Sequence, residues 1–204
     1  MDIIAITISV NYSDILQHIL NQNLKFLKKW IIVTTTSDTK TIKLLEDYKD
    51  ILDILIYDNF YTNNYKFNKG GAIKFAQDYV DLNYTDSNIL LIDSDIYLPD
   101  NFTEYLPETL NPNTLYGVSG RYDFWSLHDF IKNINPHEYK HGNNFVGFFQ
   151  LYKQNSIYKY KDSYNCAICD EIFKELFKKK IHLSMFVKHL GKDEVNWNGR
   201  TLIE

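Results

Sequence analysis

The chain has few cysteines, the residues that form disulfides in secreted proteins and hold structural metal ions. Its 204 residues include two cysteines, Cys166 and Cys169. Their i, i+3 spacing matches a redox pair or half of a zinc site, but no second pair or nearby ligand set completes a tetrahedral site, and no thioredoxin-like context surrounds them. We therefore expect two reduced thiols in the core of a cytosolic protein.

The sequence also lacks the usual signals of export and membrane insertion. No apolar run approaches the ~20 residues that span a bilayer, and residues 1–10 contain no basic leader or cleavage signal. We expect a cytoplasmic protein without a transmembrane segment, located in the host cytoplasm if the chain is viral. Basic residues are not in excess either, because the sequence has 22 Lys and Arg against 26 Asp and Glu, which gives a formal net charge of -4. Phosphate contacts need a basic footprint, so nucleic acid is not an expected partner.

Strand and helix patterns alternate through the first half of the chain. The length fits one domain, residues 1–204. We predict strands at 3–10, 30–34, 53–57 and the apolar run that begins at 88, separated by helices at 15–25, 38–48 and 69–80. Such alternation is typical of an α/β fold with a parallel, right-handed half-sheet.

The second half of the chain follows a different order. Pro99, Pro107 and Pro112 break it into turns and a short helix. Short strands are predicted at 114–119 and 145–152, then a helix at 167–180 and a strand at 181–187. We therefore expect a small mixed part after a mainly parallel central sheet flanked by helices.

Two aspartates at the end of the fourth predicted strand are the most informative feature. The run Asn88-Ile-Leu-Leu-Ile92 leads directly into Asp93 and Asp95. Side chains at i and i+2 of an extended chain point the same way, and ligands of open α/β sheets bind at this strand end. Oxygen ligands there suit Mg²⁺ or Mn²⁺. The alternative is that both aspartates cap a turn before Pro99.

Further candidates lie on either side of this pair. Lys69 precedes two glycines at a helix start, where backbone N–H groups can approach an anion, although a plain loop-to-helix junction fits equally well. His189 is a candidate third metal ligand, and its nitrogen would favour Mn²⁺ over Mg²⁺. Arg200 and Lys192 are candidates to clamp a diphosphate.

Asp170 and Glu171 stand together near the start of a predicted helix. Acids in this place stabilise the helix dipole, which needs no further role. In the alternative interpretation, one carboxylate faces the cleft and takes a proton from an acceptor hydroxyl. The spacing alone leaves both interpretations open.

Taken together, these motifs resemble the metal-dependent glycosyltransferases of the GT-A fold. The unit Asp93-Ser-Asp95 matches the metal motif of that family, and Asn68-Lys-Gly70 with Ala72 looks like its donor-side element. Two further segments resemble motifs of a small bacterial and large-DNA-virus branch of the family. One is the strand Gly147-Phe-Phe-Gln-Leu151. The other is the C-terminal element, His189-Leu-Gly191 with Asn196-Trp197 and Gly199-Arg200. The resemblance runs from the first strand to Arg200.

The resemblance implies a fold, a reaction and a set of site residues. It implies a single GT-A domain, with residues 1–97 as the nucleotide-sugar half and 98–204 as the acceptor and catalytic half. The activity would be transfer of a sugar from a UDP- or GDP-sugar to a glycan or other hydroxyl acceptor. The implied nucleotide-binding residues are Ser9, Val10, Asn11, Asp58, Lys69 and Asp93. The implied ligands of Mn²⁺ or Mg²⁺ are Asp95 and His189, with Asp93 shared between metal and ribose.

The catalytic base is less clear from the resemblance. Asp170 falls at the acidic position of the family pattern Glu-Asp-x-x-Phe, with Phe173 three residues on. Cys169 replaces the Glu of that pattern, so Glu171 is a rival to Asp170 as the base.

Two other classes of function compete with this one. A phosphohydrolase with an Asp-x-Asp nucleophile usually has a Thr shortly after the second Asp, where this chain has Ile96-Tyr97. A non-catalytic sugar-nucleotide or glycan-binding module would use the same cleft without turnover. The sequence leaves open the donor sugar and base, the acceptor, the stereochemical outcome and the oligomeric state.

Overall fold

The first half of the chain forms the predicted parallel sheet. The computed structural model describes residues 1–142, 145, 147–191 and 198–200. The parallel strands are β1 (Ile3–Ile8), β2 (Lys29–Thr34), β3 (Leu52–Ile56) and β4 (Asn88–Ile92). The helices between them are α1 (Ser13–Asn23), α2 (Thr39–Leu45) and α3 (Lys69–Asn83), and short 3-10 turns extend α1 to Phe26 and α2 to Tyr48. The alternation read from the sequence is confirmed.

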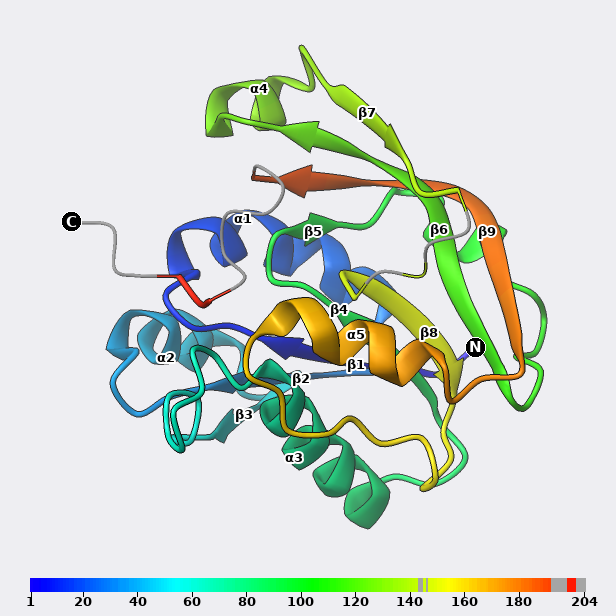
Figure 1. The fold of residues 1–204 in the computed structure, drawn as a ribbon. Helices are drawn as coiled ribbons and strands as arrows, with labels where there is room; N and C mark the ends of the chain where they lie inside the picture. The colour runs from blue at the N-terminus through cyan, green and yellow to red at the C-terminus, as the bar shows by residue number, and fades with distance from the viewer. Residues whose placement is uncertain (143–144, 146, 192–197, 201–204) are drawn as a thin grey trace.

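The second half extends the same sheet. It contributes β5 (Ile96–Tyr97), β6 (Thr114–Phe124), β7 (His137–Lys140), β8 (Phe149–Lys153) and β9 (Lys179–Leu190), with helices α4 (Leu127–Lys132) and α5 (Cys166–Lys174). The strand order is β3-β2-β1-β4-β8-β6-β9-β5, and β7 pairs with β6. Strand β8 is antiparallel to β4 and β6, whereas β9 is parallel to β6. In Figure 1 the strands β6 and β9 curve over the end of this sheet.

Several predicted boundaries in this half were wrong. The strand predicted at 114–119 continues to Phe124, and neither α4 nor β7 was predicted. The helix predicted at 167–180 ends at Lys174, because Lys179 and Lys180 already pair with Thr114 and Leu115 of β6. The short helix expected after Pro99 is a 3-10 helix at Phe102–Tyr105.

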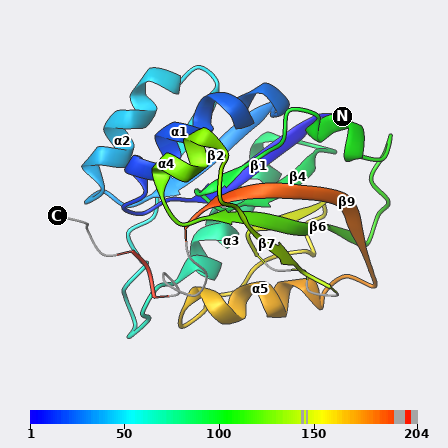
Figure 2. The same cartoon turned by 90° about the horizontal axis from the view of Figure 1, so that it is seen from above.

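Helices cover both faces of the sheet. Helices α1 and α2 lie on one side and α3 and α5 on the other, as the view from above shows (Figure 2). Successive side chains of β1 point to opposite faces of the sheet. Ile3 and Ala5 pack with α1, whereas Ile4 and Ile6 pack with α3. Every residue of β1 and β4 is buried, so these continuous apolar runs belong to strands covered on both faces. None of the helices that the structure describes is long and apolar enough to cross a membrane.

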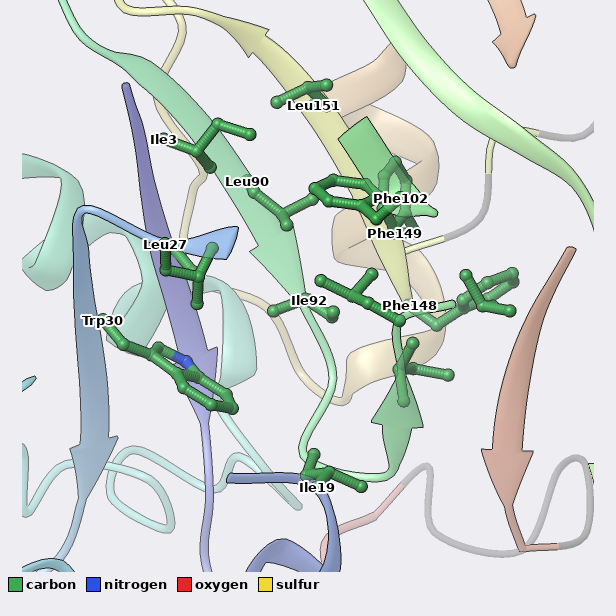
Figure 3. Close-up of a cluster of buried hydrophobic side chains, with 14 of the residues drawn as sticks. Ile3, Ile19, Leu27, Trp30, Leu90, Ile92, Phe102, Phe148, Phe149 and Leu151 are labelled. Carbon is green, nitrogen blue, oxygen red and sulfur yellow. The ribbon is translucent and has the colours of Figure 1, made fainter. Parts of the chain in front are cut away.

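The larger of the two cores joins the halves of the chain. In Figure 3, Leu90 and Ile92 of β4 lie beside Phe149 of β8 and Phe102. Trp30 of β2 is completely buried in the same core, and its indole N–H donates to Thr7 Oγ1 at 2.9 Å. Truncating a buried aromatic of this size to alanine costs about 3–5 kcal/mol. This packing holds the carboxyl end of β4 in a fixed place.

The strand order places a topological switch point, called the crevice below, at the carboxyl ends of β1 and β4. The chain moves outward from β1 to β2 and β3, then returns to place β4 on the other side of β1. Ile6 pairs with Leu91, so the residues that follow these two strands are neighbours. Ligands of open α/β sheets bind at such a topological switch point.

Candidate functional site

Asp93 and Asp95 lie in a turn at this switch point. Strand β4 ends at Ile92, and the N–H of Ile96 donates to the carbonyl of Asp93 at 3.3 Å. The expectation that both side chains project from one extended strand is therefore wrong. The turn directs the two carboxylates to different partners, Lys69 for Asp93 and His189 for Asp95.

Lys69 lies between two carboxylates in the crevice. Its ammonium Nζ is 2.8 Å from Asp93 Oδ1 and 3.7 Å from Asp170 Oδ2. The lysine is the first residue of α3, whose N-terminus is capped by Asn68 accepting from the N–H of Gly71 at 2.9 Å. The side chain of Lys69 is 9% exposed. Residues far apart in sequence thus meet around one buried positive charge.

Burial and neighbouring charges shift the pKa values of Lys69 and Asp93. Burial lowers the pKa of Lys69, but Asp170 and Asp93 overcome that effect and raise it well above its ordinary value. The pKa of Asp93 is raised to about 6, first by burial and then by the charges of Asp95 and Asp170, while Lys69 opposes the rise. The crevice therefore favours added positive charge beside Asp93.

A second group begins at Asp95. Its Oδ2 lies 3.4 Å from His189 Nε2, and His189 Nδ1 lies 2.8 Å from Asp123 Oδ1. Arg121 Nε donates to the same oxygen of Asp123 at 2.7 Å. Pairing of β5 and β9 sets Ile96 opposite His189, and pairing of β6 and β9 sets Asp123 beside it. Three strands thus fix the orientation of one imidazole.

The carboxylates around His189 favour a positive charge on the ring. Burial lowers the pKa of His189, but Asp95 and Asp123 raise it to about 9. Burial raises the pKa of Asp123, yet His189 and Arg121 hold it below its ordinary value. The arrangement matches the outer-shell carboxylate that usually orients a metal-binding histidine through its other nitrogen.

Asp95 and His189 offer an oxygen and a nitrogen donor of the kinds that divalent cations bind. Among the residues that the structure describes, no three His, Cys, Asp or Glu side chains gather as ligands of one ion. The predicted set is thus divided, since Asp95 and His189 lie together whereas Asp93 pairs with Lys69. One carboxylate and one imidazole leave coordination positions for phosphate oxygens and water, the usual way such ions are bound.

The predicted nucleotide-binding residues follow β1. Ser9 and Val10 are buried directly after the end of β1. The Ser9 N–H donates to the carbonyl of Val33, and the Ser9 hydroxyl has no partner among the described residues. Asn11 adopts a positive φ of 62°, and its N–H donates to Asp38 Oδ2 at 2.6 Å. Because Asp38 also caps α2, the end of β1 is tied to the start of that helix.

Arg200 reaches the same end of β1. Its terminal nitrogens donate to both oxygens of Asp14, at 2.6 and 2.8 Å, and to the carbonyl of Asn11 at 3.1 Å. Burial raises the pKa of Asp14, but Arg200 lowers it below its ordinary value. The predicted companions Lys192, Asn196 and Trp197 lie outside the described residues.

The remaining two predicted residues make contacts outside this crevice. Asp58 is exposed after β3, and its carboxylate accepts from Thr35 Oγ1 and from both the N–H and hydroxyl of Thr36. Those hydrogen bonds lower the pKa of Asp58. Glu171 is exposed on α5 and pairs with Lys174, whereas Asp170 on the same helix faces Lys69.

Sequence reasoning missed some residues that complete the site. Arg121 and Asp123 stand at i, i+2 of a strand, a spacing that places them on one face and was a usable signal. Tyr160, which contacts Asp170, lies in an irregular segment with no such signal. Cys166 and Cys169 form no disulfide in the part of the chain that the structure describes, and Cys169 is buried whereas Cys166 is partly buried.

Comparison with known proteins identifies the fold. No protein-family model and no curated protein matches the sequence. Among solved structures, TarS of S. aureus superposes on 94% of this chain with a TM-score of 0.65 and 12% identity. This chain covers 37% of that TarS chain. The chain has the GT-A fold.

Other structures with this fold differ in the reaction that their names state. Glucosyl-3-phosphoglycerate synthase of Mycobacterium tuberculosis, solved with Mn²⁺, UDP and its product, matches over 94% of this chain and 72% of its own, with 10% identity and a TM-score of 0.50. A 4-diphosphocytidyl-2C-methyl-D-erythritol synthase matches over 89% of this chain and 88% of its own, with 11% identity and a TM-score of 0.50. The fold thus serves both sugar transfer and nucleotidyl transfer, and the choice between them depends on the site.

Proposed function

We propose that the chain is a glycosyltransferase that moves a sugar from a UDP- or GDP-sugar to a hydroxyl of a glycan or other acceptor. The observation that carries this proposal is the position of Asp170. This carboxylate comes from the C-terminal half, yet it lies across Lys69 from Asp93 at the switch point. A base on the far side of the nucleotide crevice is what activation of an acceptor hydroxyl requires.

The donor would lie across the ends of β1 and β4. The backbone of Ser9, Val10 and Asn11 would support the nucleotide, with Asp58 at its outer edge and Asp93 near the ribose. Lys69 and the remaining N–H groups of Arg200 would face the diphosphate. Positive charge is placed there because the leaving group carries the negative charge that develops during transfer.

Asp95 and His189 would hold the cation that accompanies the donor. A bound Mn²⁺ or Mg²⁺ would supply neutralisation of the diphosphate as a Lewis acid. The imidazole nitrogen of His189 favours Mn²⁺ of the two. Asp123 and Arg121 would keep the ring of His189 in the orientation that presents Nε2 to the ion.

Asp170 would act on the acceptor. It would take the proton of the acceptor hydroxyl, whose oxygen then forms a bond to the anomeric carbon of the donor. The bond from that carbon to the diphosphate breaks, and the nucleoside diphosphate leaves with the electron pair. We assign this role to Asp170 rather than Glu171, because Glu171 pairs with Lys174 on the exposed side of α5.

A screen of donors tests the proposal directly. UDP- and GDP-sugars are added to the protein with and without Mn²⁺, and the melting temperature is measured. A ligand that binds only the folded state must raise its stability. Release of nucleoside diphosphate from a stabilising donor is then measured for the wild type, Asp95→Ala and His189→Ala. We expect the two variants to lose turnover, with Asp129→Ala, at a half-buried aspartate of α4, as the control.

Three outcomes would contradict the proposal. Wild-type activity in both variants would place the metal site elsewhere. Donor binding without turnover across a broad acceptor panel would favour a binding module. Release of pyrophosphate from a nucleoside triphosphate would favour nucleotidyl transfer, which the match to the 4-diphosphocytidyl-2C-methyl-D-erythritol synthase makes the principal rival.

A further inference from the structure

A buried tyrosine, Tyr160, donates a hydrogen bond to the carboxylate of Asp170. Tyr160 Oη lies 2.9 Å from Asp170 Oδ1 and 2.5 Å from Gln150 Oε1. Tyr160 is 1% exposed and Gln150 is fully buried. Oδ2 of the same aspartate is the oxygen that lies 3.7 Å from Lys69. One oxygen of Asp170 thus faces the protein interior and the other faces the crevice.

The tyrosine itself has little freedom to move. Its backbone N–H donates to Gln77 Oε1 at 2.9 Å, and its ring stacks on Phe173 at 4.2 Å between centroids. Phe173 lies one turn after Asp170 on α5, so the helix that carries the carboxylate also packs on the tyrosine. The hydroxyl is therefore placed by contacts that do not involve Asp170.

The single hydroxyl proton of Tyr160 faces two acceptors. The amide of Gln150 donates through Nε2 to the carbonyl of Phe145 at 3.3 Å, which leaves its Oε1 turned toward the tyrosine. Burial, followed by the charge of Asp170, raises the pKa of Tyr160 well above its ordinary value. The phenol therefore keeps its proton and can turn it toward either acceptor.

Gly147 lies against the carboxylate of Asp170. A Cβ added at Gly147 would lie 1.8 Å from Asp170 Cγ and from Oδ2. The aspartate side chain thus occupies the space that any other residue at position 147 would fill. Its position is defined by Tyr160 on one side and by the backbone of Gly147 on another.

We propose that Tyr160 is the positioning residue for Asp170 in the transfer reaction. This inference rests on the proposed function. While Asp170 is ionised, the Tyr160 hydroxyl donates to Oδ1 and leaves Oδ2 directed at the acceptor. Once Asp170 has taken the acceptor proton on Oδ2, Oδ1 becomes the carbonyl oxygen of a neutral acid and a weaker acceptor, so the hydroxyl can turn to Gln150 Oε1. The same side chain serves both states without moving its ring.

The change Tyr160→Phe removes the hydroxyl and keeps the ring. We expect kcat to fall about 10- to 100-fold, because a small displacement of a catalytic group has effects of this size. The KM for the donor should change little, since Tyr160 touches no residue assigned to nucleotide binding. The matched control is Tyr116→Phe at another buried tyrosine, whose hydroxyl accepts from the backbone N–H and side-chain amide of Asn111.

Two further variants separate positioning from general damage. In an Asp170→Asn background, Tyr160→Phe should cause no additional loss, because groups that act through one another are not additive. Gly147→Ala should displace the carboxylate while leaving Tyr160 intact, and it should lower kcat in the same range. Melting temperatures are recorded for every variant. Wild-type kcat in Tyr160→Phe, or an equal loss in the Asp170→Asn background, would overturn the inference.

A readout without turnover keeps this inference separate from the proposed function. Carboxyl carbon NMR of the ¹³C-aspartate-labelled protein reports the surroundings of Asp170, assigned with Asp170→Asn. We expect the Asp170 signal to shift in Tyr160→Phe and not in Tyr116→Phe. If the wild type transfers no sugar but the signal shifts, the proposed function fails and the contact stands. An unmoved signal in Tyr160→Phe overturns the positioning role.

Discussion

Replacing Lys69 by methionine removes the positive charge from the crevice and keeps the length of the side chain. In the folded protein, Lys69 Nζ pairs with Asp93 and lies near Asp170, and its side chain is 9% exposed. The variant leaves two carboxylates without their common partner. Lys69→Met should therefore lower the free energy of unfolding as well as abolish sugar transfer.

The size of the effect follows from the burial of the three groups. Loss of one partner from a fully buried ion pair costs about 3–5 kcal/mol. The side chain of Asp93 is 33% exposed and keeps part of its water, so we expect about 2–4 kcal/mol here. For a domain of this size each kcal/mol lowers the melting temperature by about 2–4 °C, which predicts a fall of about 5–15 °C.

The control for this prediction lies on the same helix. Lys74 pairs with Asp78 at 2.6 Å, but both side chains are nearly half exposed. An exposed pair of this kind contributes about 0.3–0.5 kcal/mol, so Lys74→Met should barely change the melting curve. Lys69→Met with Asp93→Asn should melt above Lys69→Met alone, since one unpaired charge is gone. Equal melting temperatures for the two single lysine variants would refute the reasoning.

Two other predictions concern the surroundings of the crevice. Asp123→Asn should weaken Mn²⁺ binding in the presence of UDP by about 10- to 100-fold, because the residue orients His189; an unchanged affinity in calorimetric titration would contradict that role. Gly70→Ala places a Cβ 2.0 Å from the carbonyl oxygen of Lys161 and should cost about 1–3 kcal/mol or more in urea unfolding. Gly191→Ala, whose Cβ would meet its nearest neighbour at 3.4 Å, is the matched control, and an equal loss there would contradict the overlap.

The first half of the fold was predictable because its signals are local. Each strand there is a short apolar run between turn residues, and each helix has a stripe of apolar residues. Asp38 and Asn68 cap α2 and α3 through their side chains, as such residues do at helix starts. The parallel direction of these strands followed from the alternation of strands and helices, which favours a parallel sheet.

The second half was less predictable because distant partners decide its structure. Strand β7 is exposed at all four positions and shows no apolar alternation, so only its pairing with β6 makes it a strand. The basic run at 178–180 looked like a helix end, but ten residues of β9 pair with β6 and draw Lys179 into the strand. Tertiary pairing overrode local preference in both places.

The candidate site, like the fold, was predictable only in part. Asp95 and His189 lie together as expected, and so do Lys69 and Asp93, although they are far apart in sequence. The extended geometry assumed for Asp93 and Asp95 failed because β4 ends one residue before the pair. The partner of Asp170 could not be predicted, since Tyr160 reaches it only through the folding of an irregular segment against α3 and α5.

The balance of charge in the crevice gives an argument for a cation that does not depend on resemblance. The four carboxylates of Asp93, Asp95, Asp123 and Asp170 lie with two permanent cations, Lys69 and Arg121, which leaves a formal charge of about minus two before His189 is counted. A donor diphosphate adds further negative charge, and like charges at such separations repel strongly in a partly buried site. Protonation of His189 offsets one of these charges. A divalent cation beside Asp95 would offset two and would also bind the diphosphate oxygens. Donor and cation should therefore bind cooperatively: each alone weakly, and both together tightly.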